Sequence, residues 1–262
     1  MKNFSHKKSI LKEKLLKREL SIGTWLTIPH QSIVEILASA GFEWIVIDLE
    51  HAAIDYQAMQ NIIGHIQGNG MEALVRVSRN DEVVIKHAMD AGATGVIVPM
   101  IKTPKEAETA VGYAKYPPWG NRGVGLSRAQ HYGIGFDTYK NWLTEESVVI
   151  AQVEHIESVR NLDAILDVKG IDGIIVGPYD LSASMGMPGE YEKDEVKKAL
   201  CKIDEITLRK QKSLGFHVIQ SDYRNMMEKI NKKYNFLAFS LDFFFLGDKA
   251  REEMNLLRKE LK

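Results

Sequence analysis

The chain has 262 residues, which suits one large domain or two small ones. Hydrophobic residues make up 45% of it, and the formal net charge is -1 at pH 7, with no long run of either sign. This balance argues against nucleic acid as the main partner, because nucleic-acid binding normally needs a basic face. Cys201 is the single cysteine, so a disulfide within the chain is excluded and a reducing, cytoplasmic location is expected. Its amphipathic helical surroundings favour a structural thiol over a nucleophile.

Residues 1–20 are basic and contain no unbroken apolar stretch. We therefore expect neither a secretory signal nor a membrane span, which would need about 20 apolar residues. The pattern predicts an amphipathic N-terminal helix that caps the domain.

From residue 22 onward, apolar strand-like runs alternate with segments of helical periodicity. Ser32 and Glu35 predict a capping box at the first of these helices, and Thr103-Pro104 with Glu106 predicts a similar start further along. About eight strand–helix pairs follow one another, and their strands are continuous apolar runs, as in parallel strands buried on both faces. We therefore predict an α/β fold, a single (β/α)8 TIM barrel over residues 1–262. A doubly wound sheet would give a similar pattern, but no G-x-G-x-x-G turn follows the first strand.

Polar residues stand at the carboxyl ends of several predicted strands, and the long loop after the fourth pair adds an arginine. The active site of a TIM barrel lies at this end, so we expect these side chains to share one pocket. They are Asp48, Glu50, His51, Arg76, Arg122, Gln152, Glu154 and Asp180.

Glu154 and Asp180 are hard oxygen donors. Two carboxylates on rigid strands, with the remaining positions left to water and substrate, suit an octahedral Mg²⁺ or Mn²⁺. Each acid alone is also consistent with a loop residue or a helix cap, but their joint position at successive strand ends favours a metal site. Such a cation can polarise a carbonyl oxygen.

His51 and Arg76 complete the predicted chemistry. Histidine exchanges protons near neutral pH, and the neighbouring acids could orient this one. Arg76 ends a buried run, where its charge needs a partner: either a nearby acid or an anion such as a developing enolate. The backbone N–H groups of Tyr179 and Asp180 open a helix and suit a carboxylate. Together these groups meet the needs of a 2-oxo acid that becomes an enolate.

The segments IDLEH, VRVSRND, VPM, YPPWGNRGVG, QVEH and GPYDLSASMG resemble, in order, motifs of the HpcH/HpaI family of class II pyruvate aldolases. The resemblance runs from about Ile22 to about Leu246. It implies a TIM barrel whose last helix is exchanged between subunits of a homo-hexamer, a trimer of dimers. It also implies a lyase that reversibly cleaves a 4-hydroxy-2-oxo acid into pyruvate, or a close 2-oxo acid, and an aldehyde through a metal-stabilised enolate.

The resemblance also implies roles for single residues. A divalent ion (Mg²⁺ or Mn²⁺, or Co²⁺) would bind Glu154 and Asp180, with His51 as the base and Arg76 as the transition-state stabiliser. The residues that would hold the pyruvate part come from the fifth and sixth strand ends: Gln152, Gly177, Tyr179 and Asp180.

An acid that raises the basicity of the histidine is also implied, and the matching position is Asp90. Strand geometry instead favours Asp48, because Asp90 ends a helix that returns to the opposite end of the barrel. Both acids are retained as candidates.

Several features depart from the family pattern and are where we expect aldehyde selection. They are Tyr179, Trp119, the seventh strand end at residues 217–222, and the eighth strand end at residues 240–247 with its aromatic run 243–245. Three alternatives remain open. A Schiff-base aldolase would need a lysine at a strand end, for which Lys102 is the candidate. The others are a citrate-synthase-like or acyl-CoA carboligase or lyase, and an inactive binding homologue.

Overall fold

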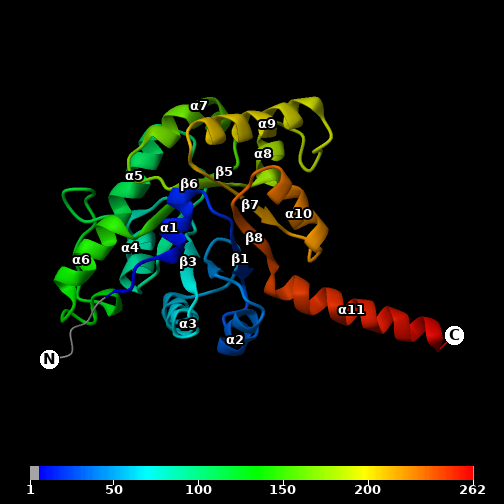
Figure 1. Ribbon diagram of the computed structural model, residues 1–262, viewed down its shortest axis with the longest axis horizontal. Coiled ribbons are helices and arrows are strands. Elements are labelled where there is room, and N and C mark those ends of the chain that lie inside the picture. Colours follow the sequence, from blue (N-terminus) through cyan, green and yellow to red (C-terminus); the bar gives the residue numbers. More distant parts are fainter. Residues whose placement is uncertain (1–5, 262) are drawn as a thin grey trace.

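The computed structural model describes residues 6–261, in which eight parallel strands close into a barrel in chain order (Figure 1). The predicted TIM barrel is therefore confirmed. The strands are β1 (Ser21–Leu26), β2 (Trp44–Asp48), β3 (Glu72–Arg76), β4 (Gly95–Val98), β5 (Val148–Val153), β6 (Gly173–Val176), β7 (Ser213–Val218) and β8 (Phe236–Leu241).

Helices follow the strands around the outside of the barrel, and the long connection before β5 and the segment after β6 carry additional ones. The sequence patterns had left the connection before β5 as a loop. The helices are α1 (Ile10–Lys17), α2 (Gln31–Ser39), α3 (Tyr56–Gly68), α4 (Glu82–Asp90), α5 (Pro104–Ala114), the 3₁₀ turn η1 (Arg128–Gln130), α6 (Phe136–Glu145), α7 (Ile156–Asp167), α8 (Pro178–Ser184), α9 (Asp194–Arg209), α10 (Tyr223–Asn231) and α11 (Asp242–Glu260).

The two predicted helix starts differ in outcome. At α5, the Thr103 side chain and Glu106 form the expected capping box, with Pro104 in the first turn. At α2, the prediction is wrong: the helix begins two residues earlier, with His30 rather than Ser32 as its N-cap, and the His30 side chain accepts the hydrogen bond from the Ser32 N–H. An imidazole nitrogen has replaced the expected serine hydroxyl as the cap.

Apolar side chains fill the barrel interior separately from the layer between strands and helices. Trp44 stacks on Phe236 inside the barrel, with ring centroids 4.4 Å apart. Leu11 and Leu15 of α1 join the same inner cluster, so α1 covers the amino-terminal end of the barrel. Glu72 fixes this helix by accepting hydrogen bonds from the Ser9 hydroxyl (2.6 Å) and the Leu11 N–H (2.8 Å). The carboxyl end of the strands is therefore the end left for a site.

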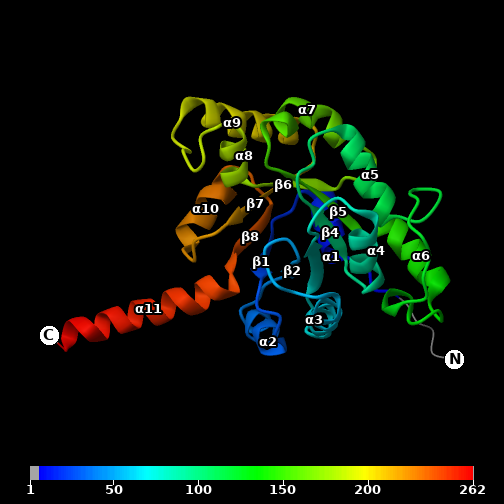
Figure 2. The same cartoon turned by 180° about the vertical axis from the view of Figure 1, so that it is seen from behind.

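The helix α11 projects away from the barrel in both views (Figures 1 and 2). Among its residues only Asp242 is buried, where it accepts hydrogen bonds from the backbone of Thr27 and Ile28. Several large apolar side chains along the helix are exposed: Leu246, Met254, Leu256, Leu257 and Leu261. An isolated helix with so much exposed apolar surface needs a partner surface in solution.

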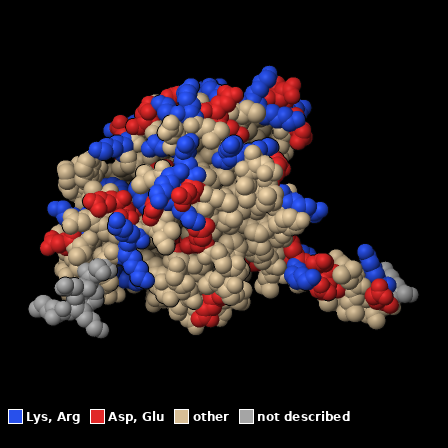
Figure 3. Space-filling view, in the orientation of Figure 1, with Lys and Arg blue, Asp and Glu red and all other residues tan. Residues whose placement is uncertain are grey.

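The surface seen in Figure 3 carries lysine and arginine intermixed with aspartate and glutamate. This face therefore shows no concentrated field of one sign. Within residues 6–261, none of the helices combines the length and apolarity needed to cross a membrane.

Gly23 of β1 leaves the space that the Trp44 indole occupies. A Cβ at this position would lie 2.1 Å from Trp44 Cδ2, so we expect Gly23→Ala to destabilise the fold by about 1–3 kcal/mol or more through overpacking. The matched control is Gly68→Ala in α3, where a Cβ would meet nothing within 4 Å. Urea unfolding of both variants measures the difference, and equal midpoints would contradict this account of the barrel interior.

Lys115, after α5, is buried at the amino-terminal end of the barrel. Its ammonium donates to the carbonyls of Leu143 (2.7 Å) and Ser147 (3.1 Å). The pKa of Lys115 is lowered from 10.5 to about 7, chiefly by burial and also by the charge of Lys12, against the opposing charge of Asp172. The folded protein therefore binds this proton less tightly than the unfolded chain does.

Between about pH 7 and 10.5 the unfolded chain carries the extra proton, so the free energy of unfolding rises with pH in this window. Lys115→Met removes that contribution, which reaches about 1.4 kcal/mol per pH unit. We expect urea unfolding between pH 7.5 and 9.5 to show a flatter pH dependence in this variant. The exposed Lys105→Met on the same helix is the control, and a wild-type slope in Lys115→Met would contradict the assignment.

Candidate active site

Alternation along the strands places polar side chains in the uppermost layer of the barrel interior. On β2, Trp44 and Val46 point inward and Asp48 is the next inward position. On β3, Leu74 points inward and Arg76 follows by the same rule. The register pairs Asp48 with Arg76 across the two strands. Gln152 follows the inward Val148 and Ile150 on β5 in the same way.

Asp48 and Arg76 form a buried two-pronged ion pair. Arg76 Nε donates to Asp48 Oδ1 (2.9 Å) and Nη2 donates to Oδ2 (2.6 Å). Burial alone would raise the pKa of Asp48, but the hydrogen bonds and charge of Arg76, with the N–H groups of Glu50 and His51, hold it below its ordinary value. The guanidinium carbon also lies 5.1 Å from the Trp25 ring centroid. Arg76 is therefore fixed in position with its charge compensated.

His51 lies at the rim of this layer, and 68% of its side chain is exposed. Its Nε2 is 3.8 Å from Glu50 Oε2, and that carboxylate is also 3.3 Å from Arg76 Nη1. Asp48 Oδ1 accepts a hydrogen bond from the backbone N–H of His51 (3.3 Å), so Asp48 contacts the backbone of His51. Of the two acids beside His51 in the sequence, Asp48 thus shapes the turn that carries the histidine, while Glu50 is nearer to the imidazole.

Glu154 follows β5 and is buried against Gly177. Its Oε1 accepts from the Met100 N–H (2.6 Å) and its Oε2 from the Gln152 amide. Met100 has φ 55, a left-handed conformation that is uncommon for a side chain of this size. A Cβ at Gly177 would lie 2.9 Å from Glu154 Oε2, so only glycine leaves this carboxylate its place. The left-handed backbone at Met100 and the absence of a Cβ at Gly177 therefore both help to hold Glu154 in position.

Asp180 lies in the first turn of α8, beside the exposed Tyr179. The alternative interpretation of Asp180 as a helix cap does not apply, because Gly177 is the N-cap and Pro178 opens the helix. The first-turn N–H groups of Tyr179 and Asp180 have no intrahelical acceptor. Both therefore stay available at the mouth of the barrel.

The carboxylates of this site repel one another. The pKa of Glu154 is raised to about 7, chiefly by burial and also by the charges of Glu50 and Asp180, which together outweigh the hydrogen bonds from Gln152 and Met100. Burial also raises the pKa of Glu50, with contributions from Asp48 and Asp180 that oppose Arg76. The carboxylates of Glu154, Glu50 and Asp180 are hard oxygen donors of the kind that a divalent cation prefers. Among residues 6–261, however, no group of three or more His, Cys, Asp or Glu side chains is arranged to hold a metal ion, so a cation here would rely on two carboxylates with water and substrate.

Arg122 and Asp90 lie elsewhere in the chain. Arg122 Nη2 donates to Asp90 Oδ1 (2.5 Å) and Nη1 donates to Tyr139 Oη (3.1 Å), and the guanidinium is buried. The Arg122 N–H also donates to the carbonyl of Lys115, which places the pair at the amino-terminal end of the barrel. The prediction that Arg122 joins the pocket is therefore wrong within one chain, because α5 has carried the chain back before this loop begins. Asp90, in turn, is the ion-pair partner of Arg122.

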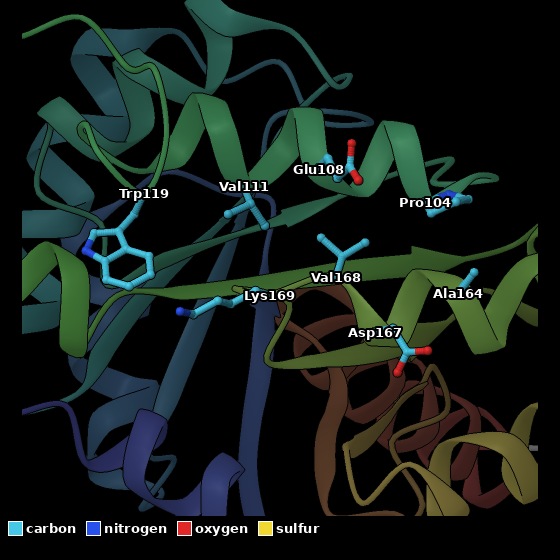
Figure 4. A pocket seen from close by; sticks show the side chains of 8 residues that line it. All are labelled: Pro104, Glu108, Val111, Trp119, Ala164, Asp167, Val168 and Lys169. Atoms are coloured by element: carbon cyan, nitrogen blue, oxygen red, sulfur yellow. The ribbon is translucent and has the colours of Figure 1, made fainter.

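Trp119 follows α5 and lines a groove of about 430 Å³ between α5 and α7 (Figure 4). The ammonium of Lys169 lies 3.9 Å from its ring centroid. Trp119 is therefore outside the barrel mouth of its own chain, contrary to the expectation that it selects the aldehyde there. Lys102 precedes the cap of α5, and Cys201 is exposed on α9.

Two residues of the upper layer were not singled out from the sequence. Trp25 lies under Arg76, and His217 of β7 stacks on Trp25 with ring centroids 4.4 Å apart. The available signal was the alternation of β7, in which Ser213, Gly215 and His217 occupy the inward positions. Glu50 had been predicted only as one of the neighbouring acids that could orient His51.

A closed parallel barrel that gathers carboxylates, an arginine and a histidine at the carboxyl ends of its strands is a TIM-barrel enzyme in architecture. The family model for HpcH/HpaI aldolase/citrate lyase matches residues 21–246, and the chain belongs to this family.

Relatives and solved structures agree with the family. The chain is 32% identical over 253 residues to the 2-keto-3-deoxy-L-rhamnonate aldolase of Escherichia coli K12, covering 94% of this chain and 92% of the relative. It is 31% identical over 236 residues to the hydroxypyruvate/pyruvate aldolase of Roseobacter denitrificans, covering 90% and 91%. An HpcH/HpaI aldolase/citrate lyase family protein from Burkholderia cenocepacia superposes with a TM-score of 0.89 at 30% identity, covering 95% of this chain and 98% of the other.

The Asp48–Arg76 pair yields a prediction about stability. Asp48→Asn removes one partner and leaves the guanidinium charge uncompensated, so we expect a loss of about 3–5 kcal/mol in the free energy of unfolding. Asp163→Asn is the control, since Asp163 pairs with Arg209 and Lys210 on the surface and its loss should cost at most about 1 kcal/mol. Denaturant unfolding compares the two variants, and equal losses would contradict a buried pair.

Proposed function

We propose that the chain is a divalent-metal-dependent aldolase that reversibly cleaves a 4-hydroxy-2-oxo acid into pyruvate, or a close 2-oxo acid, and an aldehyde. The observation that carries the proposal is the buried Glu154 carboxylate, whose pKa the charges of Glu50 and Asp180 help to raise, at the same barrel end as the fixed Arg76 guanidinium. Two relatives that match nearly the whole chain are aldolases by name.

Glu154 and Asp180 would hold the cation, for which Mg²⁺ or Mn²⁺ suits two carboxylates with positions left for water and substrate. The ion would supply a Lewis acid that polarises the 2-oxo group. Glu154 is held for this task by the Met100 N–H and the Gln152 amide. Asp180 stands on the first turn of α8, beside the N–H groups proposed to hold the substrate carboxylate with Gln152 and Gly177.

His51 takes the proton from the C4 hydroxyl of the substrate, the C3–C4 bond breaks, and the aldehyde leaves. The negative charge that develops on the 2-oxo oxygen is stabilised by Arg76, which Asp48 and Trp25 keep in place. The resulting enolate is then protonated at C3 to give the 2-oxo acid. The exposure of the His51 side chain gives it access to substrate and solvent.

Asp48 is the proposed positioning residue for the turn that carries His51, through its hydrogen bond to the His51 N–H. A role for Asp90 in raising the basicity of a histidine requires a site shared between subunits. In that arrangement the end of α4 of one chain would lie at the barrel mouth of another.

A homo-hexamer in which α11 is exchanged between subunits is part of the proposal. The support is the projection of α11 from the barrel and its exposed apolar residues, among them Leu246, Leu257 and Leu261. A cytoplasmic location is also proposed, since the single Cys201 excludes an intrachain disulfide.

The test is product analysis after incubation of the purified protein with pyruvate, Mn²⁺ or Mg²⁺ and a panel of aldehydes that includes succinic semialdehyde and small hydroxyaldehydes. We expect one or more aldol products, and loss of activity after chelation by EDTA with recovery on readdition of the ion. Glu154→Gln should abolish Mn²⁺ binding and turnover, and His51→Ala should lower cleavage by about 10² to 10⁴.

Glu157→Gln, three residues further on in the first turn of α7, is the control for Glu154→Gln and should bind Mn²⁺ normally. Borohydride trapping of a lysine adduct, with activity that survives EDTA, would replace the proposal with a Schiff-base aldolase. Citrate formed from acetyl-CoA and oxaloacetate, without any aldol product, would replace it with a carboligase.

A further inference from the structure

His217 is a polar side chain in the upper layer of the barrel that the proposed mechanism leaves without a task. On β7, Leu214, Phe216 and Val218 pack into the outer core, so the alternation turns His217 to the inner face. Its side chain is half-buried, in the same interior layer as Arg76. A titratable ring at this depth, close to the proposed reacting groups, needs an explanation.

The imidazole of His217 and the guanidinium of Arg76 contact one indole. His217 stacks on Trp25 with an angle of 15° between the ring planes, and Arg76 Cζ lies 5.1 Å from the Trp25 centroid. Trp25 thus links the group proposed to stabilise the enolate to the wall formed by β1 and β7. Only the Trp25 ring separates Arg76 from His217, so we expect a substrate held by Arg76 to lie near His217.

The hydrogen bond of His217 determines which ring nitrogen can accept. Its Nε2 lies 3.1 Å from the carbonyl oxygen of Ser240, and a carbonyl can only accept, so Nε2 carries the hydrogen. The pKa of His217 is lowered to about 4, chiefly by burial and also by the Arg76 charge, which together outweigh the Ser240 carbonyl and Asp48. At neutral pH the ring is therefore uncharged, and Nδ1 is a hydrogen-bond acceptor.

The backbone of β8 is irregular at the residue that fixes this tautomer. Ser240 has φ 54, and the pairing of β1 with β8 shifts register between Gly23 and Trp25. The Ser240 carbonyl also receives a hydrogen bond from the Thr24 hydroxyl (3.3 Å). Bulges and left-handed non-glycine residues concentrate beside functional sites, where the surrounding structure maintains them.

We propose that His217 is a specificity-determining residue whose Nδ1 accepts a hydrogen bond from a hydroxyl on C3 of the 2-oxo acid. The assignment rests on the proposed aldolase function and names its nucleophile class as 3-hydroxy-2-oxo acids, of which 3-hydroxypyruvate is the simplest. The carboxylate and keto oxygens are drawn to Arg76 and to the side of Glu154 and Asp180, so C3 faces the opposite wall, formed by Trp25 and His217. A methyl group there leaves Nδ1 without a donor, whereas a hydroxyl supplies one.

The experiment uses the full-length protein with Mn²⁺ and needs no aldehyde. NMR measures exchange of the C3 hydrogens of pyruvate and of 3-hydroxypyruvate in D₂O, and calorimetry measures the Kd of each acid. For the wild type we expect kcat/KM for exchange to be about tenfold higher with 3-hydroxypyruvate than with pyruvate, which corresponds to one hydrogen bond. The Kd of 3-hydroxypyruvate should be lower than that of pyruvate. In H217F, which keeps an aromatic ring on Trp25 but has no acceptor, the preference should vanish.

H217N separates loss of the acceptor from loss of the ring, because an asparagine Oδ1 stands where Nδ1 stood. It should keep a preference for 3-hydroxypyruvate. The matched control is H87F, which replaces an exposed imidazole stacked on Tyr56 at 4.4 Å and should leave the wild-type ratio unchanged.

A wild-type ratio near one, or a preference that survives in H217F, would overturn the role of His217 and leave the aldolase function standing. Failure of the wild type to bind or exchange either acid would overturn the aldolase function, and this assignment with it.

Discussion

The ion pair between Asp48 and Arg76 is the contact on which the geometry of the site depends. Parallel pairing of β2 with β3 brings the last residue of each strand side by side, so the register itself forms the pair. Asp48 then serves two purposes, because its carboxylate also accepts from the N–H groups of Glu50 and His51. One buried acid thereby holds the proposed charge stabiliser and shapes the turn that carries the proposed base.

The balance of charge in the upper layer is the physical reason for the proposed cation site. Arg76 compensates Asp48 fully and Glu50 in part, at 3.3 Å from Nη1. Among residues 6–261, neither Glu154 nor Asp180 forms an ion pair with a lysine or an arginine, and burial raises the pKa of Glu154 to about 7. The protein alone thus leaves negative charge at low dielectric, which is unfavourable unless a proton or a metal ion neutralises it.

Strand periodicity in the sequence was enough to predict the positions of residues at strand ends. It was not enough to predict the positions of residues in the long connections. Asp48, Arg76, Gln152 and Glu154 were placed correctly because each ends, or directly follows, an apolar run whose barrel end is known. Arg122 was misplaced because the long connection reverses the direction of the chain, and its partner Asp90 lies far away in sequence. The same periodicity applied to β7 would have singled out His217 as an inward polar residue.

The site is asymmetric around the barrel. The groups proposed to break the bond lie on one side, and the residues proposed to select the substrate lie on the other. The strands β2, β3, β5 and β6 lead into the charged groups, which any 2-oxo acid would require for binding and bond cleavage. The strands β1, β7 and β8 supply Trp25, His217 and Ser240, which carry no net charge at neutral pH and contribute shape and hydrogen-bonding groups, among them the indole N–H of Trp25, which has no hydrogen-bond partner in the part of the chain that the structure describes. A change on this second wall leaves the ion pair of Arg76 and the proposed ligand Glu154 untouched. The structure therefore permits the nucleophile to vary among related barrels while the bond-breaking groups stay the same.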